Sequence, residues 1–145
     1  MKSIGSWRTS GNWTGENRVV IKYLFDSNIL IYHLNGRLNH YGTDLLSEGL
    51  SGSGAYSIIS KIELLGFNQS ESDDRQARLL LSSLQEFELT STIAEQTIRI
   101  RKTRRLKLPD AAIAATAIIN NLVVVTRNAG DFDQIVGLNY INPFA

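Results

Sequence analysis

Residues 107–132 read KLPDAAIAATAIINNLVVVTRNAGDF, and this stretch decides the fold. Its first half is apolar on nearly every side and opens with Pro109 and Asp110, two residue types that suit the first turn of a helix. A helix without a polar face is buried. Residues 122–125 form a short β-branched run, which is typical of a strand covered on both faces of a parallel sheet. The stretch therefore predicts one buried α/β unit with an acid at each end, Asp110 and Asp131.

The composition limits the class of protein. A chain of 145 residues is long enough for one domain with a single core. It has no cysteine, which excludes disulfides, thiolate zinc sites and a thiol nucleophile. Fifteen basic and fourteen acidic residues leave a net charge of +1, so overall charge does not indicate a nucleic-acid partner. No apolar run approaches the roughly 20 residues of a membrane span, and the N-terminus lacks the apolar segment of a signal peptide. The sequence predicts a cytoplasmic protein without a membrane partner.

Two regions are expected along the chain. Residues 1–18 are rich in Gly, Ser, Thr and Asn and show no apolar periodicity, which predicts a flexible N-terminal extension. Residues 19–145 predict a single domain, with short strands at 19–25, 55–60, 88–90, 122–125 and 138–143 and with helices between them. This alternation predicts the fold class, which is α/β: a three-layer sandwich with a mostly parallel central sheet.

Local signals predict where the helices begin. A Ser or Thr followed three residues later by an acid has the form of a capping box, and Asp, Ser and Asn are the usual N-cap residues. The expected starts are Asp26, Ser27 or Asn28 before residues 29–34, Lys61 with Glu63 in the first turn, Ser70 with Asp73, and Thr92 with Glu95.

Four acids are expected at one edge of the sheet. Asp26, Glu63 and Asp131 follow the carboxyl ends of the first, second and fourth strands, and Asp110 opens the helix that leads into the fourth strand. Ligands of parallel sheets bind at this edge. Four carboxylates in one small volume stay ionised together only around a cation. Carboxylate oxygens favour Mg²⁺ or Mn²⁺, and a chain with two histidines and no cysteine offers zinc few ligands.

Each acid also has a structural explanation when it is taken alone. Asp26 and Asp110 could be N-caps, Glu63 could complement a helix dipole, and Asp131 could cap a short helix. Four structural caps have no reason to share one edge of a sheet. Their joint placement therefore favours a shared metal site.

Four motifs together resemble those of the PIN-domain ribonucleases, in order and in spacing. They are FDSNILI at residues 25–31, Glu63, LPDAAIAATA at 108–117 and TRNAGDF at 126–132. The greatest similarity is to the VapC toxins of bacterial toxin–antitoxin pairs, and it runs from about Val19 to Pro143. The extension at residues 1–18 departs from the family, in which the first strand lies near the N-terminus.

The resemblance implies a Mg²⁺- or Mn²⁺-dependent endoribonuclease that hydrolyses RNA through a metal-activated water and leaves a 5′-phosphate and a 3′-hydroxyl. It further implies a cytoplasmic toxin that forms a homodimer, is inhibited by a separately encoded antitoxin and does not bind DNA itself. The residues that it assigns are the metal-binding acids Asp26, Glu63, Asp110 and Asp131, the catalytic neighbour Asn128, and Ser27, Asn28 or Thr126 as further polar neighbours.

A basic run precedes Asp110. Six of the nine residues from Arg99 to Lys107 are Lys or Arg. Our hypothesis is that four of them hold RNA phosphates beside the acids, a contact that salt would weaken; these are Arg101, Lys102, Arg104 and Arg105. The alternative is a solvated helix C-terminus, where the helix dipole favours positive charge.

Two other functions stay open. A phosphohydrolase could use Asp26 as a covalent nucleophile, but it would want a second acid two residues later, where this chain has Asn28. A non-catalytic RNA- or protein-binding domain could keep the same fold, and its function would survive replacement of the acids. The two histidines, His33 and His40, are expected at the surface, away from the acids.

Overall fold

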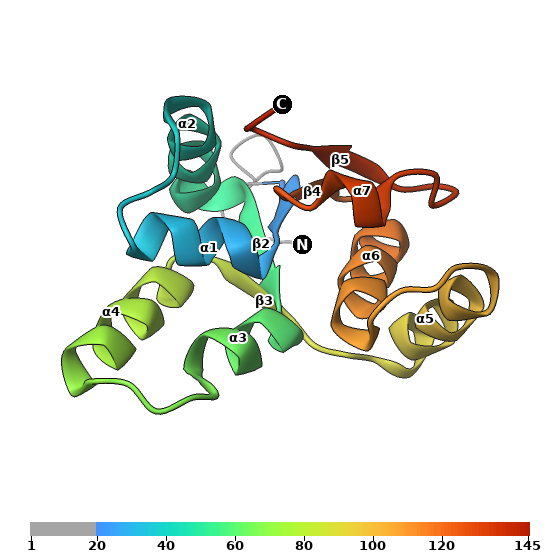
Figure 1. Ribbon diagram of the computed structural model, residues 1–145, viewed down its shortest axis with the longest axis horizontal. Coiled ribbons are helices and arrows are strands. Elements are labelled where there is room, and N and C mark those ends of the chain that lie inside the picture. Colours follow the sequence, from blue (N-terminus) through green and yellow to red (C-terminus); the bar gives the residue numbers. More distant parts are fainter. Residues whose placement is uncertain (1–19) are drawn as a thin grey trace, which may run out of the picture.

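The computed structural model describes residues 20–145 (Figure 1), so the predicted extension at residues 1–18 lies outside the described residues. The elements in chain order are β1 (Tyr23–Phe25), α1 (Ser27–Leu34), α2 (His40–Glu48), a π-helical turn η2 (Gly49–Ser53), β2 (Gly54–Ser57), α3 (Ile58–Leu65), α4 (Glu71–Ser82), β3 (Gln85–Phe87), α5 (Ser91–Thr103), α6 (Leu108–Asn120), β4 (Val123–Val125), α7 (Ala129–Phe132) and β5 (Asn139–Ile141). In this part of the chain, none of the helices is long and apolar enough to cross a bilayer.

The five strands form one sheet in the order β3-β2-β1-β4-β5, and every neighbouring pair is parallel. In the centre, Leu24 of β1 pairs with Ala55 on one side and Val124 on the other. The chain passes from β1 to β2 in one direction and reaches β4 in the other. This reversal makes the carboxyl ends of β1 and β4 the topological switch point, which is where open α/β sheets bind their ligands. The predicted parallel sheet is confirmed.

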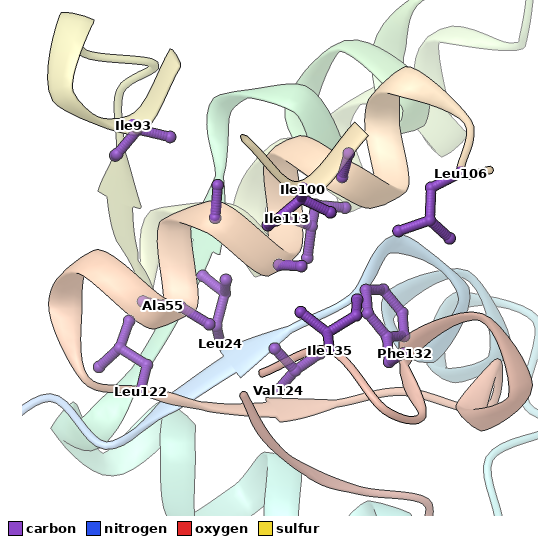
Figure 2. Packing of buried hydrophobic residues seen from close by; sticks show 14 residues of the cluster. Leu24, Ala55, Ile93, Ile100, Leu106, Ile113, Leu122, Val124, Phe132 and Ile135 are labelled. Atoms are coloured by element: carbon purple, nitrogen blue, oxygen red, sulfur yellow. The ribbon is translucent and has the colours of Figure 1, made fainter. Parts of the chain in front are cut away.

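Side chains on the two faces of the sheet belong to two separate cores. Leu24, Ala55 and Val124 pack against α5, α6 and α7, as Figure 2 shows. Tyr23, Phe25, Tyr56 and Val125 point to the opposite face and pack against α1, α2, α3 and α4. Because side chains alternate along a strand, one short apolar run supplies both cores. The predicted three-layer sandwich is confirmed.

Helix α6 forms as its sequence predicts. All residues from Ala111 to Ala117 are buried, and Pro109 lies in the first turn. The helix ends at Asn120 and is capped by Asn121, whose φ of 55° is left-handed, and the Leu122 amide donates to the Ala117 carbonyl. Full burial of a side chain such as Ile113 contributes about 1.5–3 kcal/mol. The buried helix therefore fixes Asp110, in its first turn, relative to the sheet.

The second strand and the helix after it differ from the prediction. Strand β2 ends at Ser57 rather than at residue 60, and α3 begins at Ile58 rather than at Lys61. The Ser57 hydroxyl accepts a hydrogen bond from the Ile59 amide at 3.1 Å and so starts the helix. Glu63 is consequently the sixth residue of α3, and its predicted place in the first turn was wrong.

The third strand and the start of α5 were also misplaced. Strand β3 is Gln85–Phe87 instead of residues 88–90, because α4 ends early enough for Gln85 to pair with Ala55. Helix α5 is capped by Thr90 instead of Thr92. The Thr90 hydroxyl accepts a hydrogen bond from the Ile93 amide at 3.2 Å.

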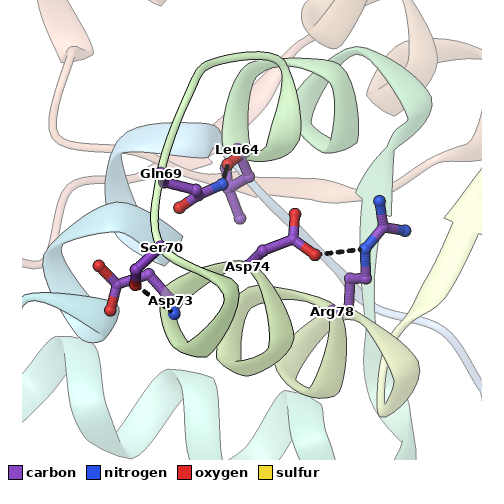
Figure 3. A network of polar contacts seen from close by, with 6 residues as sticks. All are labelled: Leu64, Gln69, Ser70, Asp73, Asp74 and Arg78. Carbon is purple, nitrogen blue, oxygen red and sulfur yellow. Dashed lines mark hydrogen bonds and ion pairs between the residues drawn. The ribbon is translucent and has the colours of Figure 1, made fainter.

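The predicted cap of α4 is confirmed and drawn in Figure 3. The Ser70 hydroxyl accepts a hydrogen bond from the Asp73 amide at 3.0 Å. The Gln69 side chain donates to the Leu64 carbonyl at 3.1 Å and ties the end of α3 to this turn. These contacts hold α3, which carries Glu63, in a fixed relation to its neighbours.

Candidate active site

Asp26 lies at the centre of the candidate site, between the end of β1 and the start of α1. It is 4% exposed and caps α1, because its Oδ1 accepts a hydrogen bond from the Ser27 amide at 2.7 Å. Its Oδ2 accepts from the Thr126 hydroxyl at 2.8 Å and from the Asn28 side-chain amide at 3.1 Å. The predicted N-cap is therefore Asp26, and three donors fix its carboxyl group.

Burial raises the pKa of Asp26 from its ordinary value to about 6. The hydrogen bonds from Thr126 and Ser27 lower the pKa, while the charges of Asp110 and Glu63 raise it further. An Asp that only capped a solvated helix end would not have its pKa raised by burial and by neighbouring carboxylates. The three acids Asp26, Asp110 and Glu63 are thus electrostatic neighbours, as the sequence predicted.

Thr126 and Asn28 join the two central strands at their carboxyl ends. Thr126 is fully buried directly after β4, and besides donating to Asp26 its hydroxyl accepts from the Asn128 amide at 2.9 Å. The Asn28 side chain donates to Asp26 and accepts from the Arg127 amide at 3.2 Å. These bonds connect α1 to the loop after β4, so both predicted polar neighbours contact Asp26 in this way.

Glu63 reaches the same edge from α3. The buried Ser27 hydroxyl donates to Glu63 Oε1 and lies 2.8 Å from the hydroxyl of Ser60, which is also buried. Ser60 and Glu63 are three residues apart on one helix and therefore share a face. The Glu63 carboxylate, which is otherwise exposed, is held next to Asp26 by the residue that follows Asp26.

Asp110 and Asp131 complete the acidic set. Asp110 is half-buried in the first turn of α6, and burial raises its pKa, as do the charges of Asp131 and Glu63, whereas Lys107 lowers it. The Asn128 side-chain amide donates to Asp131 Oδ2. Asn128 therefore orients Asp131, which lies on the short helix α7.

The donor set suits a hard divalent cation, because it consists of carboxylate oxygens that oppose one another's charge. Within residues 20–145, no three His, Asp or Glu side chains already lie close enough together to form a metal-binding group. The two histidines are exposed, and His40 pairs with Asp44 at 3.5 Å. The chemistry of the acids fits Mg²⁺ or Mn²⁺, and the coordination geometry stays a prediction.

The basic run forms the end of α5 and the loop that leads to α6. Residues 101–106 line an open hollow of about 400 Å³. None of the basic residues from Arg99 to Lys107 pairs with a carboxylate in the described part of the chain. The Arg104 Nε is buried and has no hydrogen-bond partner there. The positive charge is therefore free to meet an anion from outside.

Sequence reasoning missed two parts of the site. Ser60 was placed in a strand, so its helical spacing from Glu63 could not be seen; a helix capped by Ser57 and beginning at Ile58 would have shown it. Arg127 was quoted within a motif and given no role. Its contacts with Tyr32 and Phe144 join three separate segments, and no local pattern predicts them.

Comparison with known proteins gives a consistent result. The family model of the PIN domain matches residues 23–138. The chain is 33% identical over 127 residues to Ribonuclease VapC10 of Mycobacterium tuberculosis, and the match covers 84% of this chain and 92% of that protein.

Solved structures agree in fold. A toxin–antitoxin complex from Klebsiella pneumoniae contains a chain with 31% identity and a TM-score of 0.71, covering 84% of this chain and 98% of that one. VapBC2 from Rickettsia felis, bound to a DNA fragment from its promoter, has a chain with 23% identity and a TM-score of 0.73, with the same coverage of 84% and 98%. The second likeness concerns the fold alone.

Proposed function

This chain belongs to the PIN-domain family, and from that premise we propose that it is a metal-dependent endoribonuclease, the toxin of a toxin–antitoxin pair. The observation that carries the proposal is the placement of the buried Asp26 at the switch point of the sheet, where the charges of Asp110 and Glu63 raise its pKa, while those of Asp131 and Glu63 raise the pKa of Asp110. The similarity to a ribonuclease over most of both chains supports the substrate class.

The four acids would hold Mg²⁺ or Mn²⁺, which when bound would supply an activated water and neutralise negative charge on the phosphate. The protein's own part is to fix the carboxylates. Asp26 is held by three donors, and the Ser27 hydroxyl holds Glu63. The Asn128 amide holds Asp131. The acids are thereby positioned before a substrate arrives, which lowers the cost of ordering them during the reaction.

The basic loop is our candidate for the RNA backbone. Arg101, Lys102, Arg104 and Arg105 surround the open hollow at the end of α5, and only four residues separate Arg105 from Asp110. Since these side chains lack carboxylate partners in the described residues, phosphate would not have to displace one. An RNA strand held there would lead toward the acids.

A second hollow supports the proposed antitoxin. It has a volume of about 350 Å³, and Ile31 and Leu34 of α1, Leu64 of α3 and Ala77 of α4 line it together with Phe67. Phe67 is 60% exposed. An amphipathic segment of an antitoxin could bury the exposed Ile31 and Phe67, whereas Leu64 and Ala77 are already buried and form the floor of the hollow. Family likeness leads us to propose a homodimer and a cytoplasmic location as well.

The decisive experiment is cleavage of total cellular RNA by the purified chain with Mg²⁺ or Mn²⁺. Controls are EDTA, the variant Asp110→Asn, and Asp133→Asn, which changes an exposed acid beside the site. We expect discrete, metal-dependent fragments with 5′-phosphate and 3′-hydroxyl ends, lost in Asp110→Asn and kept in Asp133→Asn. An identical pattern from the wild type and Asp110→Asn would contradict the nuclease and favour a non-catalytic binding domain.

A further inference from the structure

Arg127 is placed beside the acids by its backbone. It follows Thr126 directly after β4, and its amide donates to the side chain of Asn28 at 3.2 Å. The same Asn28 side chain donates to Asp26 Oδ2 at 3.1 Å. One asparagine therefore separates the backbone of Arg127 from the central acid of the site.

The guanidinium group of Arg127 is held by two aromatic rings. Its Cζ lies 5.2 Å from the ring centroid of Tyr32 and 4.6 Å from that of Phe144, and its Nη1 donates to the Tyr32 hydroxyl at 2.8 Å. The two rings are 5.5 Å apart and inclined at 55°. Such contacts restrict the planar group before any ligand binds.

The segment that carries Phe144 is itself fixed. The Asn39 side chain donates to the Pro143 carbonyl at 2.8 Å, and the Phe144 amide donates to the side chain of Asn142 at 3.0 Å. The Asn142 amide group in turn reaches the Arg127 carbonyl at 3.4 Å. Helix α1, the loop after β4 and the C-terminal residues thus build one support around Arg127.

The charge of this arginine has no carboxylate partner inside the described structure. Within residues 20–145, Arg127 has no carboxylate within 4.0 Å, and its side chain is exposed. The cation–π contacts with Tyr32 and Phe144 use the positive charge, but they do not require the exposure of the guanidinium. A planar fork with a restricted orientation is suited to a phosphate, which it can bind through two parallel hydrogen bonds.

We propose that Arg127, oriented by Tyr32 and Phe144, is a substrate-binding residue that holds a phosphate of the RNA next to the acidic site. The inference rests on the proposed ribonuclease function and extends it to a second contact, on the side of the acids formed by α1 and β4. A bidentate contact of this kind would strengthen RNA binding roughly tenfold to a hundredfold. It would also fix the position of the chain relative to Asp26.

Binding of a fluorescein-labelled single-stranded RNA 12-mer, measured at several salt concentrations, tests this contact. Every protein in this assay carries Asp110→Asn, which blocks cleavage. In that background, Arg127→Met is compared with the control Arg75→Met, which removes an exposed arginine on α4. We expect Arg127→Met to bind roughly tenfold to a hundredfold more weakly and to reduce the salt slope by about 0.7, the value for one phosphate on a single strand. Arg75→Met should leave both unchanged.

Thermal unfolding separates binding from a structural role. If Arg127→Met lowers Tm but keeps the affinity and the salt slope, Arg127 is only a staple and the inference is overturned. Should Arg127→Met fail to fold, Arg127→Lys replaces it. Weaker RNA binding by Arg127→Lys at an unchanged Tm supports the bidentate contact, and unchanged RNA binding overturns the inference. If the wild type cleaves RNA, but Arg127→Met does not weaken RNA binding in the Asp110→Asn background, the inference about Arg127 fails and the proposed function stands. If the wild type neither binds nor cleaves RNA, the proposed function fails as well.

Discussion

Replacing Asp26 by Asn should stabilise the metal-free protein and abolish its activity. The folded state holds the pKa of Asp26 at about 6, whereas an unfolded Asp titrates near 3.8. Between these two values the folded chain binds more protons than the unfolded chain, so the free energy of unfolding falls as the pH rises. Above about pH 6 the charged carboxylate exerts its full destabilising effect. An uncharged side chain at this position removes that effect.

The size of the change follows from the shift. One pKa unit corresponds to about 1.4 kcal/mol, so the raised pKa of Asp26 amounts to a penalty on the order of 3 kcal/mol at pH 7.5. The Asn side chain would place an amide where Oδ2 now accepts from Thr126 and Asn28, which costs about 1 kcal/mol. A net stabilisation of about 2 kcal/mol remains, or roughly 4–8 °C in Tm for a domain of this size.

Urea denaturation in EDTA from pH 4 to pH 8 measures this difference, with Asp133→Asn as the control for an exposed acid. Asp26→Asn should be no more stable than the wild type near pH 4, gain stability over it as the pH rises toward 6, and keep a constant gain above it. A variant that is less stable than the wild type at pH 7.5 would refute the reasoning. So would a gain that does not depend on pH.

Three further outcomes are expected. Gly54→Ala should lower the free energy of unfolding, measured in urea, by about 1–3 kcal/mol, because the added Cβ would lie 2.8 Å from the Gly49 Cα. The control Gly130→Ala should leave the free energy of unfolding unchanged, because the space around Gly130 is open. Ser60→Ala should lower kcat for RNA cleavage and reduce stability by about 1 kcal/mol, because Ser60 lies 2.8 Å from the Ser27 hydroxyl; equal kcat would remove Ser60 from the site. For a site with a Kd of roughly 1 mM, 10 mM Mg²⁺ should raise the free energy of unfolding by about 1.4 kcal/mol in a thermal assay, and this gain should vanish with EDTA.

Much of the architecture could be predicted because its signals are local. The apolar helix α6 and the β-branched strand β4 follow each other without interruption, and only a fold with helices on both faces of a sheet buries both. Asp26 could be assigned as a cap from its position before α1. Parallel strand direction alone then predicts that the acids share one edge of the sheet, and all neighbouring strands are parallel.

The second strand could not be bounded from its sequence. Ile58 and Ile59 are β-branched and continue the apolar run of β2, so local propensity favours a longer strand. The Ser57 hydroxyl instead captures the Ile59 amide, and α3 begins three residues earlier than predicted. This shift affects the site directly, because it places Ser60 and Glu63 on one helical face toward Ser27.

The third strand and the arginine support were hidden for a different reason. Pairing of Gln85 with Ala55 depends on where the sheet edge lies in space, and the residues of β3 show no alternating apolar pattern. The contacts of Arg127 with Tyr32 and Phe144 span 95 and 17 residues of sequence, so no window along the chain contains them. Long-range tertiary packing decides both.

The burial of Asp26 is best explained by function. Ser or Asn would cap α1 equally well and would remain uncharged. This chain instead buries a carboxylate whose pKa the charges of Asp110 and Glu63 raise further, and Thr126 and Asn28 hold that carboxylate in place. Hydrogen bonds that fix an unfavourable charge reduce its cost without removing it. A bound cation would remove it, because the opposing carboxylates would then become ligands of the same ion, and the instability of the metal-free site would become affinity for the metal.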